Sequence, residues 1–187
     1  MTRKDFKSAV AAFFAALLVS LPVAAQTDGT DVESLLESLA QADSDTAAER
    51  LERQVITEWS KSGSPAMDLL LRRGKDALER SEFDVASEHF GALTDHAPDF
   101  AEGWLGLAQA YYGAERFGPA MDALERVLAL EPRHFGALRG VASIHEQVDR
   151  PALAYRAYER VLELRPHDPE VQQALERLER QVRGIAL

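Results

Sequence analysis

The sequence has no cysteine and an excess of acidic over basic residues. None of its 187 residues is a cysteine. This absence excludes disulfide scaffolds, thiolate metal sites, thiol catalysis and a cysteine-linked lipid anchor. Lysine and arginine together number 21, against 31 aspartates and glutamates, which gives a formal net charge of -10. This charge argues against nucleic acid and anionic membrane surfaces as partners and favours a protein partner.

Patterns typical of catalysis, metal binding and cofactor binding are also missing. No two histidines form the i, i+4 pair of an HExxH zinc motif, and the glycines form neither a G-x-G-x-x-G nor a P-loop pattern. The sequence therefore predicts no catalytic residue, no metal and no cofactor. The acidic residues are interpreted as solvent-exposed helix faces.

The first 25 residues have the pattern of an export signal. Arg3, Lys4 and Lys7 precede an apolar stretch that ends in small residues at Ala25. This order predicts a signal peptide, residues 1–25, followed by a flexible tail, residues 26–30. An uncleaved anchor is the alternative, but the stretch is shorter than the ~20 apolar residues that span a bilayer comfortably and contains a proline.

The export signal favours the periplasm of a Gram-negative cell, with full secretion as the alternative. After cleavage we expect no stable membrane insertion. Lys4 stands where a twin-arginine signal would have its second arginine, so general secretion is the expected route and the twin-arginine route stays open.

A 34-residue repeat organises the chain from residue 67. Three blocks, 67–100, 101–134 and 135–168, align without a gap, with alanine at the twentieth position of each and proline at the thirty-second. Apolar residues recur at helical spacing in both halves of a block, with a break between them. Each block is therefore predicted to form two amphipathic helices, which bury their apolar faces by stacking on neighbouring pairs. The predicted fold is all-α.

The block positions resemble those of tetratricopeptide repeat (TPR) proteins, and the second block shows the resemblance best at Trp104, Ala108, Tyr111 and Ala120. The resemblance is to small periplasmic proteobacterial members. It implies a right-handed α-solenoid of stacked antiparallel helix pairs. Residues 31–66 are predicted to form a helical hairpin, either an N-terminal cap or a degenerate repeat, and residues 169–187 a C-terminal capping helix. Capped ends favour a monomer.

The resemblance also implies where a partner binds, because the first helix of each TPR lines a concave groove. The expected binding residues are Leu71, Arg72, Lys75, Leu105, Gly106, Gln109, Tyr112, Arg139 and Ser143. The three cations among them are expected to pair with carboxylates of a peptide, while Leu105 and Tyr112 hold its apolar side chains. The alternative is that these cations pair with acidic residues of the chain itself.

Glycines 106, 136 and 140 stand where a carboxylate clamp for chaperone C-termini would need asparagine and lysine, so that ligand is not expected. They are expected to deepen the groove instead, so that Gly106→Trp would block binding without unfolding the array. The predicted function is a non-enzymatic periplasmic adaptor that binds an envelope protein or peptide. A carrier or sensor of a small ligand or peptidoglycan fragment, using the same groove, is the alternative.

Overall fold

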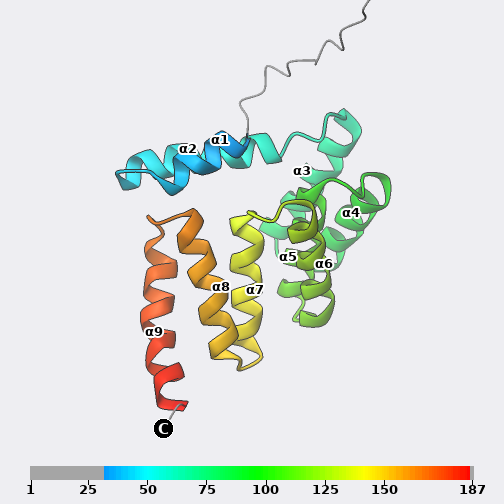
Figure 1. The fold of residues 1–187 in the computed structure, drawn as a ribbon. Helices are drawn as coiled ribbons and strands as arrows, with labels where there is room; N and C mark the ends of the chain where they lie inside the picture. Colours follow the sequence, from blue (N-terminus) through cyan, green and yellow to red (C-terminus); the bar gives the residue numbers. More distant parts are fainter. Residues whose placement is uncertain (1–31, 186–187) are drawn as a thin grey trace, which may run out of the picture.

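The computed structural model describes residues 32–185, with side chains as far as residue 182. Within this range the chain forms nine helices and no strand (Figure 1). The helices are α1 (Val32–Ala40), α2 (Asp45–Trp59), α3 (Pro65–Glu79), α4 (Phe83–His96), α5 (Ala101–Gly113), α6 (Phe117–Leu130), α7 (Phe135–Gln147), α8 (Pro151–Leu164) and α9 (Pro169–Ile185). The predicted signal peptide and tail, residues 1–30, lie outside the described residues.

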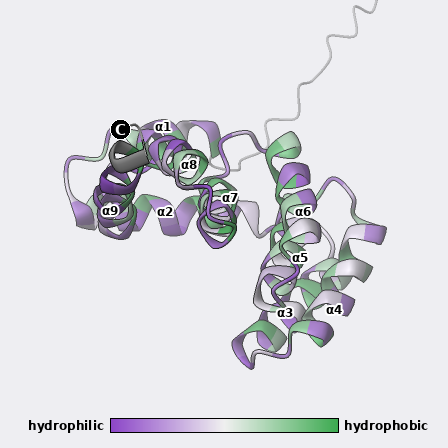
Figure 2. Cartoon of the chain, turned by 90° about the horizontal axis from the view of Figure 1, so that it is seen from below, coloured by the Kyte–Doolittle hydropathy of each residue, from purple (hydrophilic) through white to green (hydrophobic). Residues whose placement is uncertain are grey.

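Helices α3 to α8 form three antiparallel pairs that stack in chain order, and α9 packs on the last pair. Along one side of the array the first helices of the pairs, α3, α5 and α7, also contact each other directly. Figure 2 looks from below and shows α3 to α6 in one group and α7 to α9 in the other. The predicted all-α helical-repeat solenoid is confirmed.

The first helix of each pair ends in the same backbone motif. Ser81, Glu115 and Asp149 follow α3, α5 and α7 with φ values of 59°, 58° and 55°, in the left-handed region. After α5, for example, the Arg116 N–H donates to the Tyr111 carbonyl at 2.8 Å, and the Glu115 N–H donates to the Tyr112 carbonyl at 2.9 Å. This pair of bonds is a Schellman motif, which satisfies the last carbonyls of the helix and reverses the chain.

Small residues allow the helices of a pair to approach closely. Ala86, Ala120 and Ala154, which share the twentieth repeat position, have no exposed surface. Phe90 on α4 is also fully buried, and a Cβ atom added to Gly74 would lie 2.6 Å from its ring. The ring therefore occupies the space that a side chain on α3 would otherwise fill.

The α1–α2 hairpin lies across the ends of α7, α8 and α9, and it does not stack in front of α3 (Figure 1). Its buried Leu36, Leu39, Val55 and Trp59 share one apolar core with residues of α7, α8 and α9, Tyr158 among them. The hairpin therefore covers the edge of the last pair and leaves the front of the array open.

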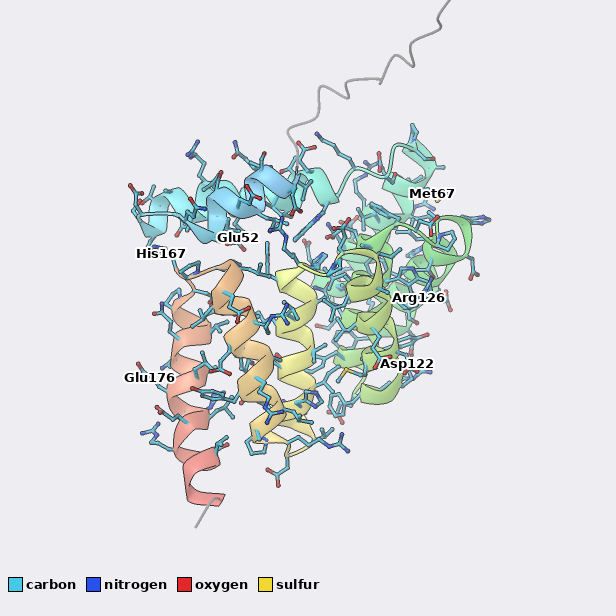
Figure 3. The ribbon with its side chains drawn as sticks, viewed as in Figure 1. Glu52, Met67, Asp122, Arg126, His167 and Glu176 are labelled. Carbon is cyan, nitrogen blue, oxygen red and sulfur yellow. The ribbon has the colours of Figure 1, made fainter. Side chains whose placement is uncertain are left out.

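Ion pairs join the hairpin to the last pair, and Figure 3 labels Glu52 and His167 at this junction. Arg165 Nη2 lies 2.5 Å from Glu52 Oε2. His167 Nδ1 lies 2.7 Å from Asp45 Oδ1, and its Nε2 lies 2.9 Å from the Ala42 carbonyl oxygen. Because both acceptors lack a proton to donate, this geometry suits the doubly protonated, cationic imidazole.

Between residues 32 and 185 no helix pair stacks in front of α3, and the residues of α3 explain why. In α5, Gly103, Gly106 and Ala110 face the preceding pair, and Ala110 has no exposed surface. At the same repeat positions α3 has Leu69, Arg72 and Asp76, all exposed. Two of these three residues carry charges that would have to lose their water beneath another helix pair. The first pair therefore ends the array with a hydrophilic face of α3.

Candidate functional site

Helices α5 and α7 enclose a cleft with a volume of about 240 Å³. Leu105, Tyr112 and Ile144 contribute apolar surface to its walls, and Gln109 and Ser143 contribute polar groups. Four of these five residues come from the inner side of the array, at the repeat positions that the TPR resemblance assigned to the groove. The cleft therefore presents an apolar surface with a few hydrogen-bonding groups.

A second cleft of about 250 Å³ continues the first toward α2. The two share Leu105, Gln109 and Gly136, and the second adds Lys75 from α3 and Ile56 from α2. We call the two clefts together the inner groove. The hairpin therefore supplies one wall of the inner groove, in addition to the three repeats.

A buried polar network forms part of the second cleft. Glu102 and His134 are 5% and 2% exposed, and His134 Nε2 lies 3.1 Å from Glu102 Oε1. His134 Nδ1 accepts a hydrogen bond from the Ala137 N–H at 3.2 Å, which assigns the proton of the neutral imidazole to Nε2. The His134 ring stacks on Trp59 with 4.1 Å between ring centroids. The network thus joins α5 to the start of α7 and to the hairpin.

The structure places seven of the nine predicted binding residues along the inner groove. Five line the first cleft, and Lys75 and Gly106 line the second. Leu71 is instead buried in the core between α3, α4 and α5. Arg72 is exposed at the repeat position that faces a preceding pair, at the front of the array. The prediction that Leu71 and Arg72 line the groove is therefore wrong.

The predicted role of the cations is also corrected. Arg139 lines the first cleft but forms an ion pair with Glu170 on α9, and its Nη1 lies 3.9 Å from Asp168 Oδ2. Lys75 Nζ lies 3.9 Å from Glu102 Oε2. For both cations the alternative interpretation applies, in which they pair with carboxylates of the chain itself.

Gly106 and Gly140 do not act as expected, whereas Gly136 lines both clefts of the inner groove. The direction in which a side chain would leave Gly106 is filled by the Phe90 ring, even more tightly than at Gly74. At Gly140 an added Cβ would meet Leu124 at 3.0 Å. Both glycines therefore admit core side chains of the preceding pair. Gly106→Trp would displace Phe90 and disrupt the array, so the prediction that it leaves the fold intact is wrong.

Sequence reasoning missed Ile56, Trp59 and His134. The apolar face of residues 48–59 shows that the second hairpin helix must be covered, but it contains no signal for which surface covers it. His134 closes the second block, at a position where the repeat pattern prescribes no partner. The long-range contacts of the hairpin were therefore the part of the site that the repeat could not predict.

The described part of the chain contains no cluster of three His, Asp or Glu side chains suited to a metal ion. Between residues 32 and 185, none of the helices has the length and apolar character needed to cross a bilayer. Near the inner groove, burial raises the pKa of the Tyr158 phenol, whose hydroxyl donates to Glu146 at 2.8 Å. The phenol thus stays neutral and serves as a hydrogen-bond donor.

Comparison with known proteins identifies the repeat. Two family models, both described as tetratricopeptide repeat, match residues 71–130 and 107–179. A TPR repeat-containing protein of Rhizobium etli is 29% identical over 153 residues, which cover 82% of this chain and 75% of the relative.

Solved structures share the fold at low sequence identity. The first TPR of Spaghetti (RPAP3), bound to an HSP90 peptide, has a TM-score of 0.60 at 22% identity and covers 62% of this chain and 92% of its own. The Yersinia enterocolitica type III secretion chaperone SycD, in complex with a peptide of the translocator YopD, has a TM-score of 0.59 at 17% identity, with 63% and 95% covered. The matched segment of this chain, residues 71–179, consists of tetratricopeptide repeats.

Proposed function

We propose that the protein is a non-enzymatic interaction scaffold that binds a segment of a protein partner in the inner groove. The observation that carries the proposal is the open, largely apolar cleft between α5 and α7. Leu105 and Tyr112 offer apolar surface of the kind that dominates binding free energy, and Gln109 and Ser143 offer hydrogen bonds to a peptide main chain. Two of the structural relatives hold a peptide.

The size of the cleft supports a peptide over a small-ligand carrier. Pockets that enclose a small molecule usually have volumes of ~300–1,000 Å³. The two clefts of the inner groove have about 240 and 250 Å³, so each lies below this range, and both are open to solvent. A side chain of a longer segment matches such a space better than a complete ligand does.

We further propose that the scaffold works in the periplasm as an adaptor or assembly factor for envelope proteins. The export pattern of residues 1–25 supports this location. Mass spectrometry of the protein from a periplasmic fraction should find its N-terminus at Gln26. A membrane-bound protein that keeps residues 1–25 would contradict the cleaved signal.

Blocking the inner groove tests the scaffold proposal. Gln109 is exposed and lines both clefts, so Gln109→Trp fills the groove without touching the core. Glu125→Trp, on the exposed side of α6 in the same repeat, is the matched control. Envelope proteins captured by the native protein and by the control, and identified by mass spectrometry, should be lost from Gln109→Trp.

Thermal unfolding of both variants checks that the array remains intact. The proposal fails if the same envelope proteins bind all three forms equally, or if the native protein retains none of them.

A further inference from the structure

We propose that the segment bound in the inner groove is apolar and basic: it inserts an apolar side chain between α5 and α7 and places a lysine or arginine beside Glu102. This inference rests on the proposed function, because it assumes that the inner groove binds a protein segment. It reverses the charge that the sequence alone suggested for the partner.

Ion pairs between the inner helices show where an apolar side chain enters. Lys75 and Glu102 link α3 to α5. On the other side, Arg139 pairs with Glu170, and Arg177 Nη2 lies 2.5 Å from Glu146 Oε2, so that α7 is linked twice to α9. Among the described residues no pair of a lysine or arginine with a carboxylate joins α5 to α7. Their polar link is the Glu102–His134 contact at the start of α7, and the apolar cleft lies between the two helices. Because no salt bridge has to break, this junction is the place where an apolar side chain can enter.

The cations around the groove are already neutralised. A third cleft, below α2, adjoins the first through Arg139 and contains Arg165. Arg165 lies 2.5 Å from Glu52 and 3.1 Å from Asp168. The permanent cations that line the three clefts are Lys75, Arg139 and Arg165, and each has a carboxylate partner within the chain. An acidic segment would therefore find no unpaired lysine or arginine in these walls.

In the third cleft, which adjoins the inner groove, carboxylates outnumber the permanent cations. The third cleft is lined by four acidic residues and two permanent cations: Glu49, Glu52, Asp168 and Glu170, with Arg139 and Arg165. In the inner groove itself the permanent charges are those of Glu102, Lys75 and Arg139. The whole chain carries a net charge of -10. The third cleft beside the groove and the chain as a whole therefore attract a basic segment and repel an acidic one.

Glu102 provides the specific contact for a cation. Its Oε1 is bound to His134, whereas its Oε2 lies 3.9 Å from Lys75 Nζ, beyond hydrogen-bond distance. The Lys75 side chain is 43% exposed and can turn into solvent. A lysine or arginine of the partner would then donate to Oε2, in a charge-assisted hydrogen bond from within the second cleft.

A peptide library tests the inference on the intact protein. The probes are nonapeptides with blocked ends, a central leucine or phenylalanine, and Ala, Ser, Lys, Arg, Asp or Glu at the flanking positions. Peptides retained by the native protein should be enriched in Lys and Arg over Asp and Glu by about tenfold, the effect expected of one charge-assisted hydrogen bond. Retention should be lost from Gln109→Trp.

Glu102→Gln tests the named contact. Glutamine keeps an oxygen that accepts from His134, so the variant preserves the buried hydrogen bond while removing the charge. The enrichment in Lys and Arg should fall to about twofold, while the preference for a central apolar residue remains. Glu125→Gln, at an exposed position of α6, is the matched control and should leave the enrichment unchanged.

Salt gives a second measurement that requires no substitution. Retention of the Lys-flanked peptides by the native protein should fall as sodium chloride rises, because screening weakens their long-range attraction to the acidic third cleft and to the chain as a whole. Retention of Ser-flanked peptides should not fall.

The outcomes separate this inference from the proposed function. Enrichment in Asp and Glu, no charge preference, or no salt effect would overturn the basic-segment inference, while retention that is lost from Gln109→Trp would still support the groove. Peptides that bind Gln109→Trp as well as the native protein, or that bind neither, would overturn the proposed function itself.

Discussion

At the residue scale, the turns after α3, α5 and α7 are held by residues poorly suited to them. Ser81, Glu115 and Asp149 adopt positive φ, a conformation that costs a residue with a Cβ atom about 1–2 kcal/mol and costs glycine almost nothing. Aspartate tolerates this conformation better than glutamate, since its short side chain can bond to the local backbone. The three turns therefore differ in strain although they share one geometry.

Glu115→Gly should stabilise the protein by about 0.5–1 kcal/mol, because the relief of strain exceeds the extra chain entropy that glycine has in the unfolded state. Asp149→Gly should give a smaller gain. Urea unfolding followed by circular dichroism measures both. The matched control is Glu125→Gly in the middle of α6, which should cost about 1 kcal/mol. A loss of stability in Glu115→Gly would mean that the side chain of Glu115 contributes more than its backbone costs.

At the element scale, the spacing between helices depends on paired residue sizes. Phe90 of the first repeat lies against Gly74 of the same repeat and Gly106 of the second repeat. One repeat further along, the equivalent residues are Ala108 and Leu124 of the second repeat and Gly140 of the third. A larger residue on one helix is thus matched by a smaller one on the helix that faces it.

Gly74→Ala should destabilise the array by about 1–3 kcal/mol, because the added Cβ collides with the Phe90 ring. Adding Phe90→Leu reproduces the combination of the second repeat, so the double variant should be more stable than the sum of the single changes predicts, by about 1 kcal/mol. A double-mutant cycle from urea unfolding measures this coupling.

Gly91→Ala is the control on the neighbouring helix. An added Cβ at Gly91 meets no atom within 4 Å, and alanine favours the helix, so stability should rise by about 1 kcal/mol. If the effects of Gly74→Ala and Phe90→Leu on the free energy of unfolding simply add, Phe90 does not set the spacing between α3 and α4.

The helices were predictable from the sequence because each follows from local spacing. The repeat places Leu105, Gln109 and Ser143 on the inner side of their helices, and the structure has them along the groove. The orientation of Gly106 was not predictable in this way, since a glycine has no side chain whose polarity would indicate the face on which it lies. Its role depends on Phe90, a residue of another helix.

The position of the hairpin was beyond prediction for a related reason. Its apolar residues require a cover, and the front of α3 and the edge of the last pair are both available along the chain. The choice is made by contacts between distant residues, such as Trp59 on His134 and Glu52 with Arg165. No repeat unit contains both members of such a pair.

At the scale of the whole molecule, two histidines make stability depend on pH in opposite ways. The hydrogen bond to Asp45, with that to the Ala42 carbonyl, raises the pKa of His167 above 6.5. The contribution of His167 to the free energy of unfolding is complete below pH 6.5 and is lost as the pH rises through the folded-state pKa. Burial, with the charge of Arg150, lowers the pKa of His145. The contribution of His145 to the free energy of unfolding is complete above pH 6.5 and is lost as the pH falls through the folded-state pKa.

His167→Gln should therefore lower the free energy of unfolding more at about pH 5.5 than at about pH 8. His145→Gln should show the reverse trend. Its free energy of unfolding, relative to that of the native protein, should be most favourable at acidic pH. Urea unfolding of the three proteins across this range measures both trends. A loss in His167→Gln that is the same at every pH would show that the ring is neutral where it meets Asp45.

The hairpin also sets the order in which the molecule is completed. Each helix pair can form from residues close in the chain, whereas the contacts of Arg165 with Glu52 and of His167 with Asp45 join residues 113 and 122 positions apart. Local contacts form faster than distant ones, because less chain has to be brought together. The hairpin is therefore expected to dock after the helix pairs have formed. Until residues 165–167 are available, the apolar side of α1 and α2 remains exposed, and during this interval the chain is most open to aggregation or to a chaperone.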